Sequence, residues 1–316
     1  MNFILRPCID VSTWPVYQRQ DSAPYAHGAR DKTLLHSPAD VQAPWLPNHF
    51  YLFKLSDRRY PQQFWMEVIA SLLGDVLPLE VQNSFPAYRD GVSASLIEFF
   101  VYPDERNRLM QGGELMEKAI LDYDFEKGTQ HNLEDVLTQL TKLHKQRLVE
   151  DEFKESFFSL LLFDALIGNS DRHHDNWGIL LHRIGHDQIG QLSPAFDNGT
   201  SMGREIVPQK LKNYAHVNDL DRYIDKGCHH LRLRRDSEKQ LGHLEFIKWC
   251  KQHESAVAAR FRDWLPSDAQ LETLTDFLTQ HYSQPEVPLI ALDNERISFT
   301  MRLLRRRLHR IQELLP

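Results

Sequence analysis

The first hundred residues contain short apolar runs separated by turn-forming residues, a pattern typical of a β-rich region. One predicted strand covers residues 50–55, and its period-two alternation places Lys54 on the same face as Phe50 and Leu52. A second strand is predicted over residues 95–100, and the polar turn after it would suit a hinge between two lobes.

A helix is predicted over residues 63–73, because apolar residues recur there at helical spacing and Gly74 follows as a candidate C-cap. Glu67 lies on the same row of this helix as Ala70 and Ser71. Small residues on that row allow a close approach to a neighbouring element, so we expect the carboxylate to face that neighbour.

From about residue 105 the pattern becomes mainly helical. Apolar residues with a period near 3.6 predict an amphipathic helix over residues 133–148, with Asn132 as its cap. Residues 153–167 are apolar on nearly every side, which is typical of a helix buried in a core. Gly168 ends this helix, so the polar residues that follow it begin at a rigid point.

A hairpin is predicted next, from strands over residues 177–181 and 188–196 around a turn at Gly185. The last helix, residues 297–315, has an apolar stripe interleaved with arginines. Two interpretations stay open for it: a packed helix with a basic solvent face, or a dock for an acidic partner or substrate. The arginines are Arg302, Arg305, Arg306, Arg307 and Arg310.

The composition is that of a globular protein large enough for two lobes, with 316 residues of which 41% are apolar and 26% charged. No run of about eighteen apolar residues occurs, so we expect no membrane span. The formal charge of −7 argues against bulk binding of nucleic acid. Three widely spaced cysteines favour reduced thiols and a cytoplasmic location, with secretion as an effector left open.

The most informative stretch precedes the predicted hairpin, where Asp171 and Asn176 have the spacing D-x-x-x-x-N. Asp197 follows the hairpin, which would bring it back beside Asn176. A phosphoryl-transfer site needs one group to orient the attacking hydroxyl and two oxygen ligands to hold Mg²⁺. These three residues supply them, and Lys54 with Glu67 matches the lysine and helix glutamate of a kinase N-lobe.

A weaker signal lies in residues 25–33, where Gly28 would let backbone amides approach phosphates and Arg30 and Lys32 add positive charge. The stretch has one glycine and is therefore neither a Walker loop nor a G-x-G-x-x-G loop. An ordinary surface turn is the competing interpretation.

Taken in order, these features resemble the HipA-like kinase family of bacterial serine/threonine protein kinases, from about residue 27 to about residue 205. The most specific part runs from Leu166-Ile167-Gly168-Asn169-Ser170-Asp171-Arg172-His173 through Asn176, and then Ser193-Pro194-Ala195-Phe196-Asp197. The resemblance implies an α+β, bilobed protein-kinase-like fold. Residues 1–100 are expected to form a β-rich N-lobe and residues 101–316 a mainly helical C-lobe.

The resemblance also implies residue roles. Asp171 is expected to be the catalytic base, with His173 in the same catalytic loop, and Asn176 and Asp197 are expected to bind Mg²⁺. Lys54, held by Glu67, is expected to contact the phosphates of ATP. The other nucleotide-binding residues are expected to lie in the phosphate loop and the hinge: Gly28, Ala29, Arg30, Lys32, Glu98, Phe99 and Phe100.

The expected function is therefore ATP- and Mg²⁺-dependent transfer to serine or threonine of a protein substrate. A toxin or effector role, and an antitoxin or other regulatory partner, are left open. Asp175 stands where many family members have lysine, and the loop D-R-H-x-D-N is also similar to that of phosphoinositide lipid kinases. A phosphoinositide or small-molecule kinase and an ATP-binding pseudokinase are the alternatives.

Overall fold

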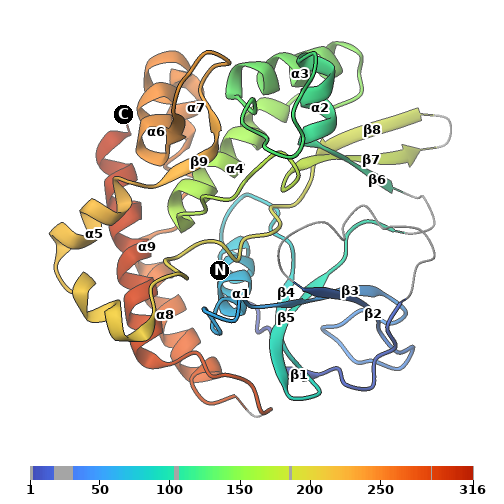
Figure 1. The fold of residues 1–316 in the computed structure, drawn as a ribbon, viewed down its shortest axis with the longest axis vertical. Coiled ribbons are helices and arrows are strands. Elements are labelled where there is room, and N and C mark those ends of the chain that lie inside the picture. The colour runs from blue at the N-terminus through green and yellow to red at the C-terminus, as the bar shows by residue number, and fades with distance from the viewer. Residues whose placement is uncertain (1–2, 18–30, 103–106, 185–186, 286, 316) are drawn as a thin grey trace.

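The protein is represented by a computed structural model. Figure 1 shows a sheet with helix α1 in one half of the molecule, and a second sheet with most of the helices in the other half. The structure describes residues 3–17, 31–102, 107–184, 187–285 and 287–315.

The N-terminal half is built on a five-stranded sheet with the order β1-β4-β5-β3-β2. β1 and β4 pair in parallel, and the other neighbours pair antiparallel. The strand predicted over residues 95–100 corresponds to β5, which begins earlier, at Val92, and ends at Glu98. Phe99 and Phe100 were expected to end the strand, but they follow it as coil. The strands are β1 Ile9–Asp10, β2 Lys32–His36, β3 Phe50–Leu55, β4 Ser84–Arg89 and β5 Val92–Glu98.

Strand β3 has the predicted bounds, and its alternation decides where Lys54 points. Tyr51 and Phe53 pack into a small apolar core with Leu96 of β5. Because successive side chains alternate between the two faces of a sheet, Lys54 faces away from this core. It lies opposite Ser95 in the pairing with β5, on the face that α1 covers.

Helix α1, Phe64–Gly74, is buried from its first residue to Leu73. Gly74 was expected to cap the helix from outside, and this detail is wrong: Gly74 is the last helical residue and Asp75 caps it in a right-handed conformation. A Cβ on Gly74 would lie 2.8 Å from Cβ of Val81. The glycine therefore permits close packing of the helix against the segment that follows it.

The second sheet has the order β6-β7-β8, and its β7–β8 hairpin confirms the predicted one. Asn132 caps α3, accepting a 2.9 Å hydrogen bond from the amide of Asp135, as predicted. Helix α4 has the predicted bounds, and Gly168 ends it with φ +71°. The elements are β6 Asn107–Gln111, α2 Gly112–Ala119, α3 Leu133–Lys145, α4 Phe153–Ile167, β7 Gly178–Ile184 and β8 Asp187–Leu192.

The C-terminal third adds a layer of helices and a short hairpin around α4 (Figure 1). Its apolar residues join those of α1 and α4 in one large core. The elements are the 3₁₀ helix Pro208–Tyr214, α5 Val217–Ile224, β9 Cys228–Arg232, β10 Gln240–Gly242, α6 His243–His253, α7 Ser255–Arg260, α8 Asp268–Tyr282 and α9 Asn294–Leu314.

Three arginines of α9 form ion pairs or hydrogen bonds with other parts of the chain. Arg306 and Arg310 pair with Asp221 at 2.6 and 3.1 Å, while Arg307 is buried and donates to the carbonyl of Ala165 at 3.0 Å. A basic solvent face is therefore the wrong description for these three arginines, because neighbouring elements hold them.

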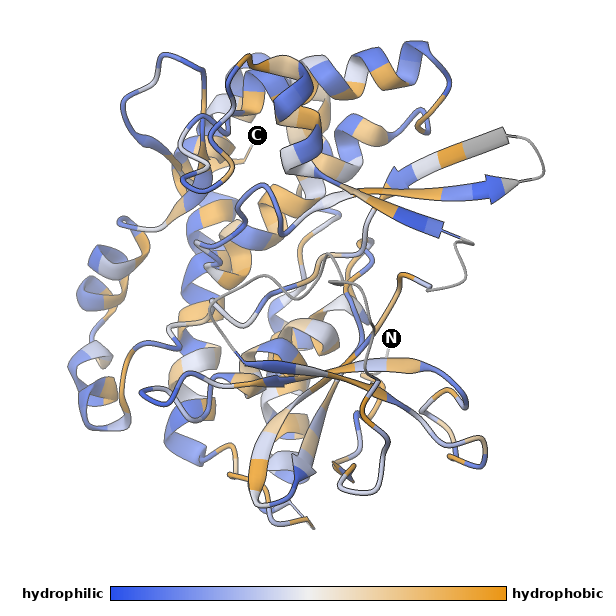
Figure 2. Cartoon of the chain, turned by 45° about the vertical axis from the view of Figure 1, so that its right-hand side comes forward, coloured by the Kyte–Doolittle hydropathy of each residue, from blue (hydrophilic) through white to orange (hydrophobic). Residues whose placement is uncertain are grey.

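Figure 2 shows hydrophobic and hydrophilic residues alternating along most helices, as expected where one side of a helix is buried. Helices α1 and α4 depart from this pattern, since ten residues of each are buried. Among the described residues, no helix combines the length and the apolar character that crossing a bilayer requires.

Candidate active site

Lys54 joins the N-terminal sheet, α1 and the segment after the β7–β8 hairpin. Its Nζ lies 2.9 Å from Oε1 of Glu67 and 2.5 Å from Oδ1 of Asp197. Lys54 and Glu67 are almost fully buried, with exposed side-chain fractions of 5% and 3%. A charge this deep in the protein is costly without a partner, so the three groups hold one another in place. The structure thus brings these predicted residues together.

The segment after Asp197 is fixed to α1. The second carboxylate oxygen of Glu67 accepts a 2.8 Å hydrogen bond from the amide of Asn198, and Gln63 donates to the carbonyl of Gly199 at 3.1 Å. Asp197 itself has φ +54°, a left-handed conformation that non-glycine residues seldom adopt. Such backbone strain persists where surrounding contacts determine it, and these contacts do so for Asp197.

The loop that follows α4 is organised by side chains of asparagine. Asn169 accepts a 3.1 Å hydrogen bond from the amide of Asp171, and Asn176 donates from Nδ2 to the carbonyl of Asp171 at 2.8 Å. The second contact fixes the orientation of the Asn176 amide, with its oxygen on the opposite branch. The hydroxyl of Thr200 lies 3.4 Å from Oδ2 of Asp171. A hydroxyl can therefore reach this carboxylate.

Arg172 connects the two halves of the site. Its guanidinium is fully buried and makes a two-nitrogen contact with Asp164 of α4, at 3.0 and 2.8 Å. Nη1 donates to the backbone carbonyls of Asn176 (2.9 Å) and Phe196, and Nη2 donates to Oδ1 of Asn198 at 2.7 Å. One nitrogen thus holds the backbone of Asn176 and of the residue before Asp197. This arrangement sets the spacing of the two predicted metal ligands.

Asp164 and Arg172 received no role from sequence reasoning. The sequence does contain a sign of this pair, since Asp164 is a carboxylate in a helix that is otherwise apolar on nearly every side. A buried charge requires a partner, so a nearby arginine could have been expected. Burial raises the pKa of the Asp164 carboxyl, and the adjacent Arg172 guanidinium opposes that shift.

His173 lies at the edge of the loop, with 30% of its side chain exposed. Its ring contacts those of His174 and His230, at centroid distances of 5.7 and 5.8 Å. His174 is buried, and burial lowers its pKa while the neighbouring Asp175 raises it. The structure therefore places His173 beside the site, in an imidazole-rich surrounding.

The expected phosphate loop lies mainly outside the described residues, since Gly28, Ala29 and Arg30 fall there. Lys32 is the first residue of β2 and pairs in register with Lys54. The strand that leaves this loop therefore lies directly beside the buried lysine.

The expected hinge follows β5. Gln82 donates to the carbonyl of Glu98 at 2.8 Å, and the amide of Phe99 donates to a carbonyl of β3 at 3.0 Å. The carbonyl of Phe100 accepts from Asn107 at 2.8 Å. These contacts fix the backbone of the expected hinge against β3 and the segments at Gln82 and Asn107.

Three buried histidines near the loop make stability depend on pH. Burial lowers the pKa of His131 and of His229 to about 3, and that of His243 well below its usual value. The unfolded chain binds protons near pH 6.5 that the folded protein excludes. The stability that these neutral histidines contribute to the folded protein is therefore fully present above pH 6.5 and is lost as the pH falls toward 3. We expect the free energy of unfolding to fall by about 1.4 kcal/mol per histidine for each pH unit below about 6.

Urea denaturation at pH 7, 6 and 5 measures this loss. His229 has no hydrogen-bond partner in the described part of the chain, so His229→Leu removes one titrating group without removing a hydrogen bond. The variant should show a pH dependence that is shallower by one proton. Parallel curves for the variant and the wild type would contradict the assignment.

Comparison with known proteins gives the family. The family model described as HipA-like C-terminal domain matches residues 25–267. The serine/threonine-protein kinase CtkA of Helicobacter pylori is 23% identical over 212 residues, which are 63% of this chain and 61% of that protein. The matched region is thus less than two thirds of that relative.

Solved structures give the fold. The structure of the Helicobacter pylori proinflammatory kinase CtkA superposes with a TM-score of 0.70 at 18% identity, covering 98% of this chain and 96% of that one. A complex of HipA, HipB and operator DNA from Shewanella oneidensis MR-1 gives a TM-score of 0.45 at 16% identity, covering 94% of this chain and 67% of that one. The fold is therefore α+β and kinase-like, as the sequence predicted. Because the family model matches most of its length, the chain belongs to the HipA-like C-terminal domain family.

Proposed function

We propose that the protein is an ATP- and Mg²⁺-dependent kinase that phosphorylates serine or threonine of a protein substrate. The observation that carries the proposal is the pairing of Lys54 with both Glu67 and Asp197, next to the Asp171 loop. A lysine between a helix glutamate and a metal-binding aspartate is the arrangement by which kinases hold nucleotide phosphates. The N-lobe, residues 1–100, and the C-lobe, residues 101–316, would enclose the nucleotide.

The roles follow from the chemistry of each group. The Asp171 carboxylate accepts the proton of the substrate hydroxyl. The oxygen of that hydroxyl forms a bond to the γ-phosphorus of ATP, while the bond between the γ-phosphorus and the departing ADP breaks. The distance to the Thr200 hydroxyl supports this role, because it places a hydroxyl within reach of that carboxylate. His173 lies at the edge of the same loop, where it would help to position the substrate.

The residues present suit a magnesium ion. The amide oxygen of Asn176 and the carboxylate of Asp197 are hard oxygen donors, the type that Mg²⁺ prefers. Arg172 donates to the carbonyls of Asn176 and Phe196, so it links the backbone at Asn176 to the backbone just before Asp197. When bound there, the ion would neutralise charge on the phosphates. Lys54 would share that task.

The nucleotide base would lie at the hinge. Glu98, Phe99 and Phe100 offer backbone groups there, and Gly28 to Lys32 would cover the phosphates. The proposal includes toxin activity, an antitoxin or other regulatory partner, and a cytoplasmic location. These three features rest only on membership of the family.

The test is phosphosite mapping. We expect the purified protein, incubated with Mg²⁺-ATP and a cell lysate, to produce new phosphoserine or phosphothreonine sites detectable by mass spectrometry. Omission of Mg²⁺ should remove them. Transfer to phosphoinositide instead of protein would show a lipid kinase. Thermal stabilisation by Mg²⁺-ATP without any transfer would show a pseudokinase, and either result would overturn the proposal.

A further inference from the structure

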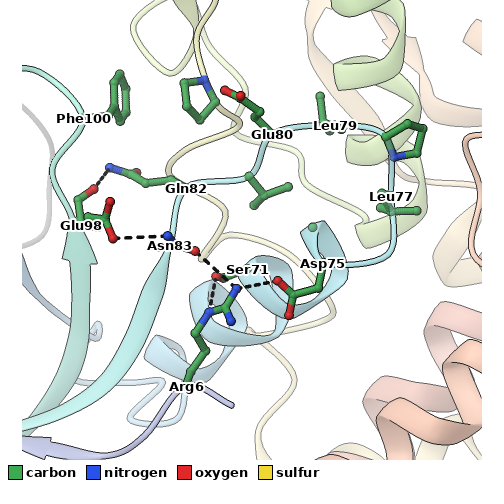
Figure 3. A pocket seen from close by; sticks show the side chains of 14 residues that line it. Arg6, Ser71, Asp75, Leu77, Leu79, Glu80, Gln82, Asn83, Glu98 and Phe100 are labelled. Carbon is green, nitrogen blue, oxygen red and sulfur yellow. Dashed lines mark hydrogen bonds and ion pairs between the residues drawn. The ribbon is translucent and has the colours of Figure 1, made fainter. Parts of the chain in front are cut away.

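A cavity of about 550 Å³ lies between the end of α1, the segment that follows it, and the end of β5 (Figure 3). Its volume is within the range of small-molecule sites. Glu98 and Phe100 line it, whereas Lys54, Asp171 and Asp197 do not. The cavity therefore adjoins the expected hinge but is separate from the phosphate end of the proposed active site.

The polar floor of the cavity is organised around Arg6. Its guanidinium lies 2.7 Å from Oδ1 of Asp75, and it donates to Ser71 (3.2 Å) and Asn83 (3.3 Å), as Figure 3 shows. Asp75 neutralises the charge of Arg6. Asn83 also donates to Oε2 of Glu98 at 3.2 Å. This network orients Glu98 before any ligand arrives, which lowers the entropic cost of binding.

Two carboxylates remain without a cationic partner. Neither Glu80 nor Glu98 forms an ion pair with a lysine or arginine of the described residues. Apart from the Arg6–Asp75 pair, the lining thus carries two negative charges. Apolar side chains also line the cavity, from Leu77, Leu79, Val81, Phe100 and Pro194, and the amide of Gln82 lies between the two glutamates (Figure 3).

We propose that this cavity binds a small organic cation. A cationic group at one end would lie against the carboxylate of Glu80 and one at the other end against that of Glu98, which lie apart in the cavity, with the alkyl part against the apolar side chains (Figure 3). Negative charge beside apolar side chains suits a ligand with both characters, whereas a hydrated metal ion would leave the apolar wall unused.

The position of the cavity couples it to the site described above. Asp75 caps α1, the helix that carries Glu67. The segment at Glu80 and Gln82 pairs with Ala195, two residues before Asp197, through hydrogen bonds of 2.8 and 3.1 Å. A ligand here therefore contacts elements on both sides of Lys54. We expect it to change the affinity for Mg²⁺-ATP, an effect that rests on the proposed function and is reciprocal by linkage.

Titration calorimetry with agmatine, an alkyl chain with an ammonium at one end and a guanidinium at the other, tests the site on the full chain at about 0.15 M salt. We expect saturable binding with one ligand per chain. Glu80→Lys should weaken it by about tenfold, because it replaces an attraction with a repulsion. Glu272→Lys makes the same change of charge at an exposed position of helix α8 and should leave the affinity unchanged.

Several results would overturn the proposal: no saturable binding, equal weakening in both variants, or full displacement of agmatine by a non-hydrolysable ATP analogue. The last result would assign the cavity to the nucleotide itself. The titration is made without nucleotide, so an inactive kinase leaves its outcome unaffected. Binding of agmatine with unchanged affinity for Mg²⁺-ATP would overturn the coupling alone.

Discussion

Replacing Asp171 with asparagine is expected to lower kcat for phosphoryl transfer by about 100- to 10,000-fold while the protein stays folded. The amide cannot accept the proton of the attacking hydroxyl. The fold should persist because Asp171 supports its loop through backbone groups, which the substitution leaves in place: its amide donates to Asn169 and its carbonyl accepts from Asn176. Thr200 is a side-chain partner, at 3.4 Å.

Asp175→Asn is the matched control, since it makes the same chemical change four residues away in the same loop. It should retain most of the wild-type rate of transfer and the wild-type affinity for Mg²⁺-ATP. Steady-state rates and the denaturation midpoint of both variants decide the case. Wild-type turnover by Asp171→Asn, or an equal loss in both variants, would reject Asp171 as the base.

Local periodicity accounts for the parts of the fold that the sequence predicts well. Strand β3 and helix α4 have the predicted bounds, because alternation and all-round apolarity are properties of neighbouring residues. The Lys54–Glu67 contact also follows from local patterns. Lys54 is charged on the face of β3 that α1 covers, and Glu67 is charged on a buried helix, so each needs a partner of opposite charge. The spacing of Asp171 and Asn176 is equally local.

Long-range partners explain what the sequence left out. Arg172 was visible in the catalytic motif, but its hydrogen-bond partners lie in three places: helix α4, the loop itself and the segment around Asp197. The arginines of α9 misled for the same reason: helical spacing gives no sign that Asp221 and Ala165 lie against them. Charged residues on one face of a helix therefore predict an exposed face only when no distant part of the chain packs against it.

Arg172→Leu is expected to lower the free energy of unfolding by about 3–5 kcal/mol, because it leaves the carboxylate of Asp164 buried without its partner. Urea denaturation measures this change. Arg306→Leu is the matched control, since Arg306 also contacts an aspartate through two nitrogens but is partly exposed. Its loss should cost about 1 kcal/mol or less. Similar values for the two variants would contradict the assigned role of Arg172.

The double variant Asp164→Leu/Arg172→Leu separates stability from positioning. It removes the unpaired charge, so it should be more stable than Arg172→Leu alone. The carbonyls of Asn176 and Phe196 still lose their donor, so the direct link between the backbone at Asn176 and the backbone before Asp197 is lost. We therefore expect the concentration of Mg²⁺ needed for half-maximal transfer to stay raised in the double variant. A double variant that recovers both stability and the wild-type Mg²⁺ requirement would reduce Arg172 to a structural ion pair.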